Sequence, residues 1–168
     1  MNESMMERVP PHNHEAEQSV IGAIFLEPQA LITASEILMP DDFYRTAHQK
    51  IFQTMIRLSD QGKAIDVVTV TEELSAKKEL EDVGGLSYLS ELANAVPTAA
   101  NIAHYAKIVE EKALLRRLIR TATKIVEDGY TREDEVEVLL SEAEKKMMEV
   151  ANRKNAGDFK HVKDVLVQ

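Results

Sequence analysis

The chain of 168 residues contains no cysteine and no tryptophan. Without cysteine it can form no disulfide, no thiolate metal site and no cysteine nucleophile, a composition that fits a reducing cytoplasm. No apolar run approaches the ~20 residues that a membrane-spanning helix needs. The first residues also lack the basic flank and apolar core of a signal peptide. We therefore expect a cytoplasmic chain that does not enter a membrane.

Aromatic residues are scarce as well, at 5% of the chain, whereas the hydrophobic content reaches 44%. This content is typical of a folded protein and argues against wholesale disorder. The core must therefore be built mainly from Ala, Leu, Ile, Val and Met. Such a composition favours helices packed on helices, and we predict an all-α fold.

Basic residues are few in the first part of the chain. Residues 1–100 carry 7 Lys and Arg against 16 Asp and Glu, a net charge of −9, whereas residues 101–168 carry 13 of each kind. An acidic surface repels a phosphate backbone. We therefore expect no tight direct DNA binding by this domain.

Signatures of catalysis are missing too. The one Gly-Lys pair, Gly62-Lys63, precedes Ala64 and lacks the upstream glycine of a Walker A loop. No serine lies in a nucleophile elbow. His12 and His14 lie beside acidic residues without a second ligand cluster elsewhere, so we interpret them as a solvated helix start. The sequence predicts no catalytic, cofactor or metal site in this chain.

The apolar periodicity divides the chain into four parts. We predict a flexible arm over 1–12, a compact globular helical bundle over 13–97, a long antiparallel helical hairpin over 98–151 and an interdomain linker over 152–168. The last part includes the start of a linker helix.

Several helix boundaries can be predicted within the bundle. Asn13 is a suitable N-cap for a first helix, and Thr46 and Thr69 each begin a Thr-x-x-Gln or Thr-x-x-Glu capping box. The segment 65–70 could instead be extended. Pro28 suits the first turn of another helix.

The hairpin is predicted from two amphipathic helices separated by a short break. Gly129 is expected to end the first helix. Apolar residues then recur at steps of 4, 3, 4 and 3, as in a coiled-coil seam. In this register Lys124 would pair with Glu135 and Arg117 with Glu142. We therefore interpret the stripe of basic residues on the first helix as an acid-paired face; it consists of Lys112, Arg116, Arg117, Arg120 and Lys124. The residues of the predicted seam are Val136, Leu140, Ala143, Met147 and Val150.

A polar stretch, 152–157, follows the hairpin and reads as a linker. The segment after it carries apolar residues on one helical face, and the sequence ends there. We therefore expect this face to pack on a neighbouring subunit or on a further domain. Its apolar residues are Phe159, Val162, Val165 and Leu166.

Several ordered motifs resemble the N-terminal domain of bacterial DnaB-type replicative helicases, in the style of the Bacillus members. The segment Pro11-His-Asn-His-Glu-Ala-Glu-Gln-Ser-Val-Ile-Gly22 resembles the start of that domain. The remaining motifs follow in the family's order and extend the resemblance over about residues 9–168. They are Asp42-Phe-Tyr-Arg45, His48-Gln-Lys-Ile-Phe52, Asp66-Val-Val-Thr-Val70, Gly85-Leu-Ser-Tyr-Leu89 and Pro97-Thr-Ala-Ala-Asn101 with Tyr105.

The resemblance implies a non-catalytic domain of a ring helicase. In the family, six such domains form a collar as a trimer of dimers, and the collar recruits the C-terminal helicase-binding domain of DnaG primase. A helicase loader is a further candidate partner. ATP and magnesium belong to a RecA-like motor domain, which is absent from this chain. The face containing Phe159 matches the family's linker helix, which docks on the motor domain of an adjacent subunit.

The resemblance also suggests six residues for collar and primase contacts. Intrachain or dimer packing is the alternative for Ile119 and Leu140, and ordinary helix packing is the alternative for Tyr88. Tyr and Ile suit protein interfaces as anchors. The candidates are Asp82, Tyr88 and Asn94 on the bundle and Ile119, Ile125 and Leu140 on the hairpin.

Two other functions remain open from the sequence. A small helical hydrolase or nucleotide-handling enzyme could use His48 or His104 with acidic partners. A stand-alone helical adaptor or helicase regulator would need no motor domain at all.

Overall fold

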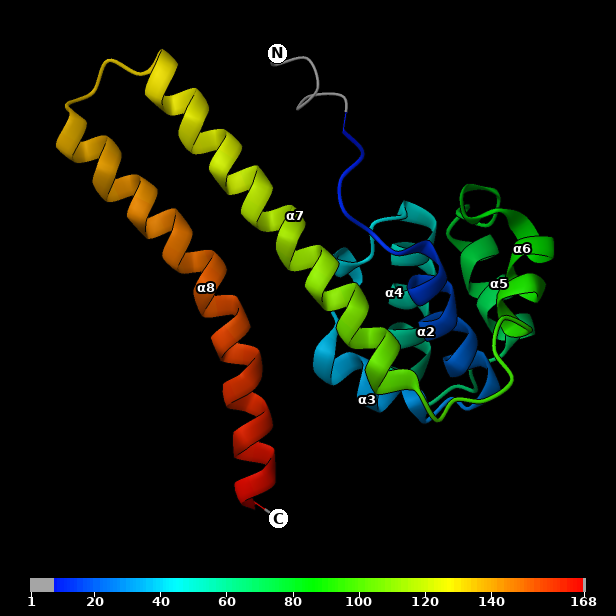
Figure 1. Ribbon diagram of the computed structural model, residues 1–168. Coiled ribbons are helices and arrows are strands. Elements are labelled where there is room, and N and C mark those ends of the chain that lie inside the picture. Colours follow the sequence, from blue (N-terminus) through cyan, green and yellow to red (C-terminus); the bar gives the residue numbers. More distant parts are fainter. Residues whose placement is uncertain (1–7, 168) are drawn as a thin grey trace. The chain divides into compact units, whose positions relative to one another are not determined.

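The computed structural model describes the backbone of residues 8–167 and the side chains of residues 8–152 (Figure 1). Every regular element among these residues is a helix, so the prediction of an all-α fold is confirmed. None of the described helices combines the length and the apolar character needed to cross a membrane. The chain divides into two compact units, His12–Glu111 and a second one built on the chain from Lys112 onward.

The first unit is the bundle. Asn13 caps its first helix by accepting a hydrogen bond from the amide of Ala16 at 2.9 Å, as predicted. The start of the long helix α7 also belongs to this unit, because Ile102, Ala106 and Val109 are buried in its core. The predicted hairpin segment 98–151 therefore includes residues that pack in the bundle. The bundle helices are α2 (His14–Leu26), α3 (Ala30–Ile37), α4 (Thr46–Asp60), α5 (Val67–Ala76), α6 (Gly85–Ala93) and the start of α7 (Ile102–Thr131), with 3-10 turns η1 (Pro40–Asp42) and η2 (Glu81–Val83).

Helix α2 is the centre of the bundle. It contacts α3, α4 and α6, and Val20, Ile21 and Ile24 are fully buried. Their spacing places them on one broad face, which the surrounding helices cover. Phe43, between η1 and α4, is also fully buried and packs at a tilt against Phe52, with ring centroids 5.0 Å apart.

Neither predicted capping box forms as expected: α4 starts at Thr46 as predicted but has no side-chain cap, and the box of α5 lies three residues earlier. Helix α4 begins at Thr46 itself after the N-cap Arg45, and Gln49 donates through Nε2 to the carbonyl of Phe43. Helix α5 begins three residues earlier than predicted, because Asp66 and Thr69 form the capping box there. The segment 65–70 is therefore a helix start and contains no strand.

The second unit is an antiparallel hairpin of α7 and α8 (Val136–Val167), joined by residues 132–135 (Figure 1). Gly129 lies inside α7, which ends only at Thr131, so the predicted stop at Gly129 is wrong. The predicted ion pairs are also replaced: Lys124 pairs with Asp128 one turn along its own helix, and Glu142 pairs with Arg132.

Helix α8 continues through residues 152–157, so the break predicted there is absent from the backbone. The predicted docking residues of the linker helix lie in the C-terminal part of α8. Their side chains are outside the described residues, and their role stays a prediction. They are Phe159, Val162, Val165 and Leu166.

We expect Gly22→Ala to lower the free energy of unfolding by about 1–3 kcal/mol. A Cβ atom at this position would lie 2.7 Å from the carbonyl oxygen of Leu92 and 3.1 Å from the Cβ of Ala95, so α2 and α6 would have to separate. Urea unfolding measures the loss. Gly129→Ala is the matched control, because a Cβ there meets nothing within 4 Å, and a helical alanine is worth roughly 0.5–1 kcal/mol over glycine. Equal destabilisation by both substitutions would contradict this account of Gly22.

Candidate functional site

A chain of hydrogen bonds centred on the buried side chains of Glu17 and His48 links three helices of the bundle. Glu17 on α2 contacts Nδ1 of His48 on α4 at 2.7 Å, and Nε2 of His48 contacts the hydroxyl of Tyr88 on α6 at 2.7 Å. Gln18 then donates through Nε2 to the Tyr88 oxygen at 3.2 Å. Because Glu17 as a carboxylate only accepts, His48 carries its proton on Nδ1 and accepts the hydroxyl proton of Tyr88 on Nε2.

The Glu17 carboxylate is stabilised in spite of its burial. Burial alone would raise the pKa of Glu17, but hydrogen bonds from His48 and from the amides of Tyr44 and Arg45 outweigh it and hold the pKa below its ordinary value. Burial raises the pKa of Tyr88, so its hydroxyl stays protonated.

The order Glu17, His48, Tyr88 matches the carboxylate, imidazole and hydroxyl of a hydrolase triad in residue type. However, His48 has no exposed surface from which it could contact a substrate. A hydroxyl with a raised pKa is also a poor nucleophile. In the described part of the chain, no group of three or more His, Asp or Glu is placed to hold a metal. The arrangement therefore ties helices together, and the hydrolase alternative finds no support in its geometry.

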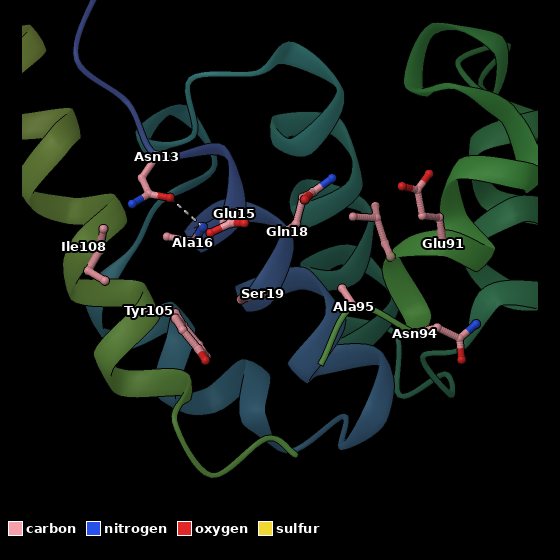
Figure 2. Close-up of a pocket in the computed structure, with 11 residues that line it drawn as sticks. Asn13, Glu15, Ala16, Gln18, Ser19, Glu91, Asn94, Ala95, Tyr105 and Ile108 are labelled. Atoms are coloured by element: carbon pink, nitrogen blue, oxygen red, sulfur yellow. Dashed lines mark hydrogen bonds between the residues drawn. The ribbon is translucent and has the colours of Figure 1, made fainter. Parts of the chain in front are cut away.

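A polar groove of about 570 Å³ lies beside this network, between α2, α6 and the start of α7 (Figure 2). Two amide side chains on its walls donate hydrogen bonds within the bundle. Gln18 donates to the hydroxyl of Tyr88, and Asn94 donates through Nδ2 to the carbonyl of Ser90. Each keeps a side-chain oxygen as an acceptor. With the exposed carboxylates of Glu15 and Glu91, the groove is rich in acceptors and negative charge, which suits a cationic donor such as an arginine or lysine side chain.

Asp128 lies near the hairpin tip and is almost fully buried among cationic groups. A hydrogen bond from Lys146 at 3.1 Å, with a further contribution from Lys124, holds the pKa of Asp128 below its ordinary value against the effect of burial. Arg132, in the connecting loop, pairs with Asp134 and Glu142. These contacts join the end of α7 to the start of α8.

A small apolar pocket of about 180 Å³, which we call the tip pocket, adjoins this cluster. It is lined by side chains from both helices of the hairpin, including Ile125, Leu139 and Leu140.

Many apolar side chains of the hairpin remain exposed. In the predicted seam of α8, Val136 is 69% exposed and Leu140 64%, so α7 of the same chain does not cover them. Ile119 on α7 is 50% exposed. Exposed apolar patches of this kind mark interaction surfaces. Further exposed apolar residues on the two helices are Leu115, Leu118, Val126, Val138, Met147 and Met148.

The predicted contact residues fall into separate places. Ile125 and Leu140 line the tip pocket together. Asn94 lines the polar groove, whereas Tyr88 is half-buried with its hydroxyl engaged inside the bundle. Asp82 is exposed and pairs with Lys50 at 3.0 Å, and it is not part of the groove lining. Their roles as partner contacts stay predictions.

Sequence reasoning missed Glu17 and the partners of His48. From the sequence, His12, His14 and the acidic residues beside them are interpreted as a solvated helix start, although Glu17 is 1% exposed. The spacing carried one usable signal: Glu17 lies three residues before Val20 and four before Ile21, so it shares a helix face with these two fully buried residues.

Residues 9–111 match the family described as "DnaB-like helicase N terminal domain". The whole chain is 64% identical to the replicative DNA helicase DnaB of Geobacillus stearothermophilus and 65% identical to the replicative DNA helicase DnaC of Bacillus subtilis. It spans 37% of the length of each of these relatives.

Two solved structures share the fold. The N-terminal domain of DnaB helicase from Mycobacterium tuberculosis matches with a TM-score of 0.80 and 40% identity, covering 84% of this chain and 99% of that one. A DnaB-like replicative helicase, described together with its interactions with primase, matches with a TM-score of 0.68 and 28% identity over 82% of this chain and 31% of that one.

We expect Glu17→Gln to lower the free energy of unfolding by about 1–3 kcal/mol at neutral pH, because it weakens three hydrogen bonds to a buried carboxylate. The pKa of Glu17 is lower in the folded than in the unfolded chain. Its contribution is therefore fully present above the ordinary pKa of 4.5 and is lost as the pH falls through the folded value. Urea unfolding between neutral and acidic pH should show the difference between the two proteins shrinking below that pKa. The exposed Glu36→Gln is the control, and a difference that does not change with pH would argue against an ionised Glu17.

Proposed function

Because the chain belongs to the family of DnaB-like helicase N-terminal domains, we propose that it is the assembly and docking domain of a hexameric replicative DNA helicase. The domain itself is not an enzyme. The observation that carries the proposal is the hairpin's apolar surface, which its own chain leaves exposed.

Assembly would proceed by pairing hairpins from two copies. Val136 and Leu140 follow the coiled-coil spacing, and a second hairpin would bury them in the way that seam positions require. Removing apolar surface from water contributes roughly 25 cal/mol per Å². Three such dimers would form the collar of a six-membered ring, as the resemblance implies.

Primase is the proposed partner of the assembled collar. A related helicase has been described with its interactions with primase. On this chain, the tip pocket, at its side lined by Ile125 and Leu139, would take an apolar anchor of the primase C-terminal domain. Six equivalent sites on one ring would also raise the effective primase concentration at the fork.

The polar groove would contribute a second, electrostatic contact. Glu15 and Glu91 favour a basic segment of the partner, and Asn94 lies on the same groove. Such charged contacts at a rim govern association rate and salt dependence more than affinity. A helicase loader is a further candidate for this face.

ATP-driven strand separation belongs to the proposal for the whole protein. The chain spans about a third of its relatives' length and contains no Walker A loop in its sequence. A RecA-like motor domain would hold ATP and magnesium, and α8 would lead toward it through Phe159 and the residues after it. We place the protein in the cytoplasm, where replication takes place.

We expect Leu140→Ser to weaken self-association of the chain roughly tenfold, because a seam position would lose its apolar contact. Sedimentation velocity over a concentration series measures the change. Val68→Ser is the matched control, since Val68 is 66% exposed on α5 of the bundle. Unchanged self-association of the Leu140 variant, or equal loss in both variants, would contradict hairpin pairing.

We expect Ile125→Ser to weaken binding of the DnaG C-terminal domain by roughly tenfold or more, as removal of an interface anchor does. Isothermal titration calorimetry measures this. Primase binding that is insensitive to Ile125→Ser would remove the tip pocket from the proposal.

The double variant Glu15→Gln, Glu91→Gln should reduce the salt dependence of primase binding, because it removes two negative charges from the polar groove. The double variant Glu36→Gln, Glu81→Gln is the control for net charge.

A further inference from the structure

Aromatic stacking fastens the segment that enters α2 to the segment that enters α4. The ring of His12 stacks on Tyr44 with centroids 4.2 Å apart, and the ring of His14 stacks on His48 with centroids 5.4 Å apart. The Glu17 carboxylate joins the same two segments by accepting from His48 and from the amides that precede α4. We refer to His14, Glu17, Arg45 and His48 as the clasp.

One member of the clasp has an unmet hydrogen bond. The Nδ1 atom of His14 is buried and has no hydrogen-bonding partner among the described residues. As a neutral imidazole, His14 leaves an acceptor unpaired there. A second proton would turn that atom into a buried donor that also lacks an acceptor, at a higher cost because the ring is then charged.

The surroundings of His14 oppose a positive charge. Arg45 precedes α4 and carries a permanent positive charge, whereas His48 in the first turn of α4 and His12 before α2 would add to the repulsion only when they are themselves protonated. His14 is also the first residue of α2, where the helix dipole disfavours cations. Among the described residues, Glu17 is the anion that acts on His14, and both of its oxygens already accept hydrogen bonds.

We propose that the clasp is a proton-sensitive latch, closed while His14 is neutral and loosened when His14 takes up a proton. Burial first, and then the positive charge of Arg45, lower the pKa of His14 from its ordinary value of 6.5. Since the folded pKa is the lower one, the stabilisation by His14 is present above 6.5 and is lost as the pH falls through the folded value.

Protonation of His14 would affect the wall of the polar groove. Asn13 and Glu15, on either side of His14, both line that groove. Loosening the first turn of α2 would therefore change the groove and leave the core around Ile21 and Ile24 intact. This inference does not depend on primase being the groove's partner.

The test is hydrogen exchange of backbone amides in the 168-residue chain at pH values from about 7.5 to about 5.5, corrected for the intrinsic pH dependence of exchange. In the wild type, opening of residues 16–19 should rise roughly threefold or more on acidification. The variant His14→Asn, which cannot take up a proton, should show no such rise. His104→Asn is the matched control, because His104 is exposed on α7, and it should behave like the wild type.

NMR titration of the histidine rings in the wild type gives a second measurement that needs no variant. His14 should titrate below 6.5 while amides 16–19 shift with the same midpoint. The proposal is overturned if His14 titrates at or above 6.5, or if the acid-induced opening persists unchanged in His14→Asn. Opening that extends to the amides of α5 at the same pH would mean global unfolding and would also overturn it.

Discussion

The bundle depends on one buried carboxylate. Glu17 accepts hydrogen bonds from His48 and from the amides of Tyr44 and Arg45, so α2 and the start of α4 cannot separate without exposing or orphaning a charge. Removing a partner from a buried charge typically costs about 3–5 kcal/mol. His48 extends the same constraint to α6 through Tyr88. The relative positions of three helices that are distant in sequence are therefore fixed by directional hydrogen bonds, which constrain them more strictly than apolar packing alone would.

The two units differ in how much of their apolar surface is buried within the same chain. In the bundle, the apolar face of α2 is covered by neighbouring helices of the same chain. In the hairpin, Leu140 and Val136 remain exposed although they follow a coiled-coil spacing. Long helices are stabilised mainly by burial of an apolar face. A hairpin with much of that face exposed is suited to association, which agrees with the proposed role in a collar.

Much of the architecture was predictable from the sequence, and the errors have physical causes. Asn13 was found as a cap because its side chain acts locally, on an amide three residues away. The start of α5 was misplaced because Asp66 and Thr69 are both good capping residues, and the sequence does not say which one begins the helix. The start of α4 depends on a residue far away in the sequence. The carboxylate of Glu17, 28 residues before Arg45, accepts hydrogen bonds from the backbone amides just ahead of that helix. The ion pairs of the hairpin were wrong because α7 passes Gly129, which moved the loop and changed the register.

The sequence by itself determined the all-α class, the order of the helices, the absence of a phosphate loop and the membership of a helicase family, because these follow from composition, periodicity and motifs along the chain. Only the tertiary structure decided that Glu17 and His48 are buried partners, that Tyr88 turns its hydroxyl inward, and that Glu15, Glu91 and Asn94 line one groove. The partners from different helices in these relations lie 31 to 79 positions apart along the chain. The packing of the helices decides which of these polar side chains become partners, because the sequence alone shows only that each of them can form hydrogen bonds.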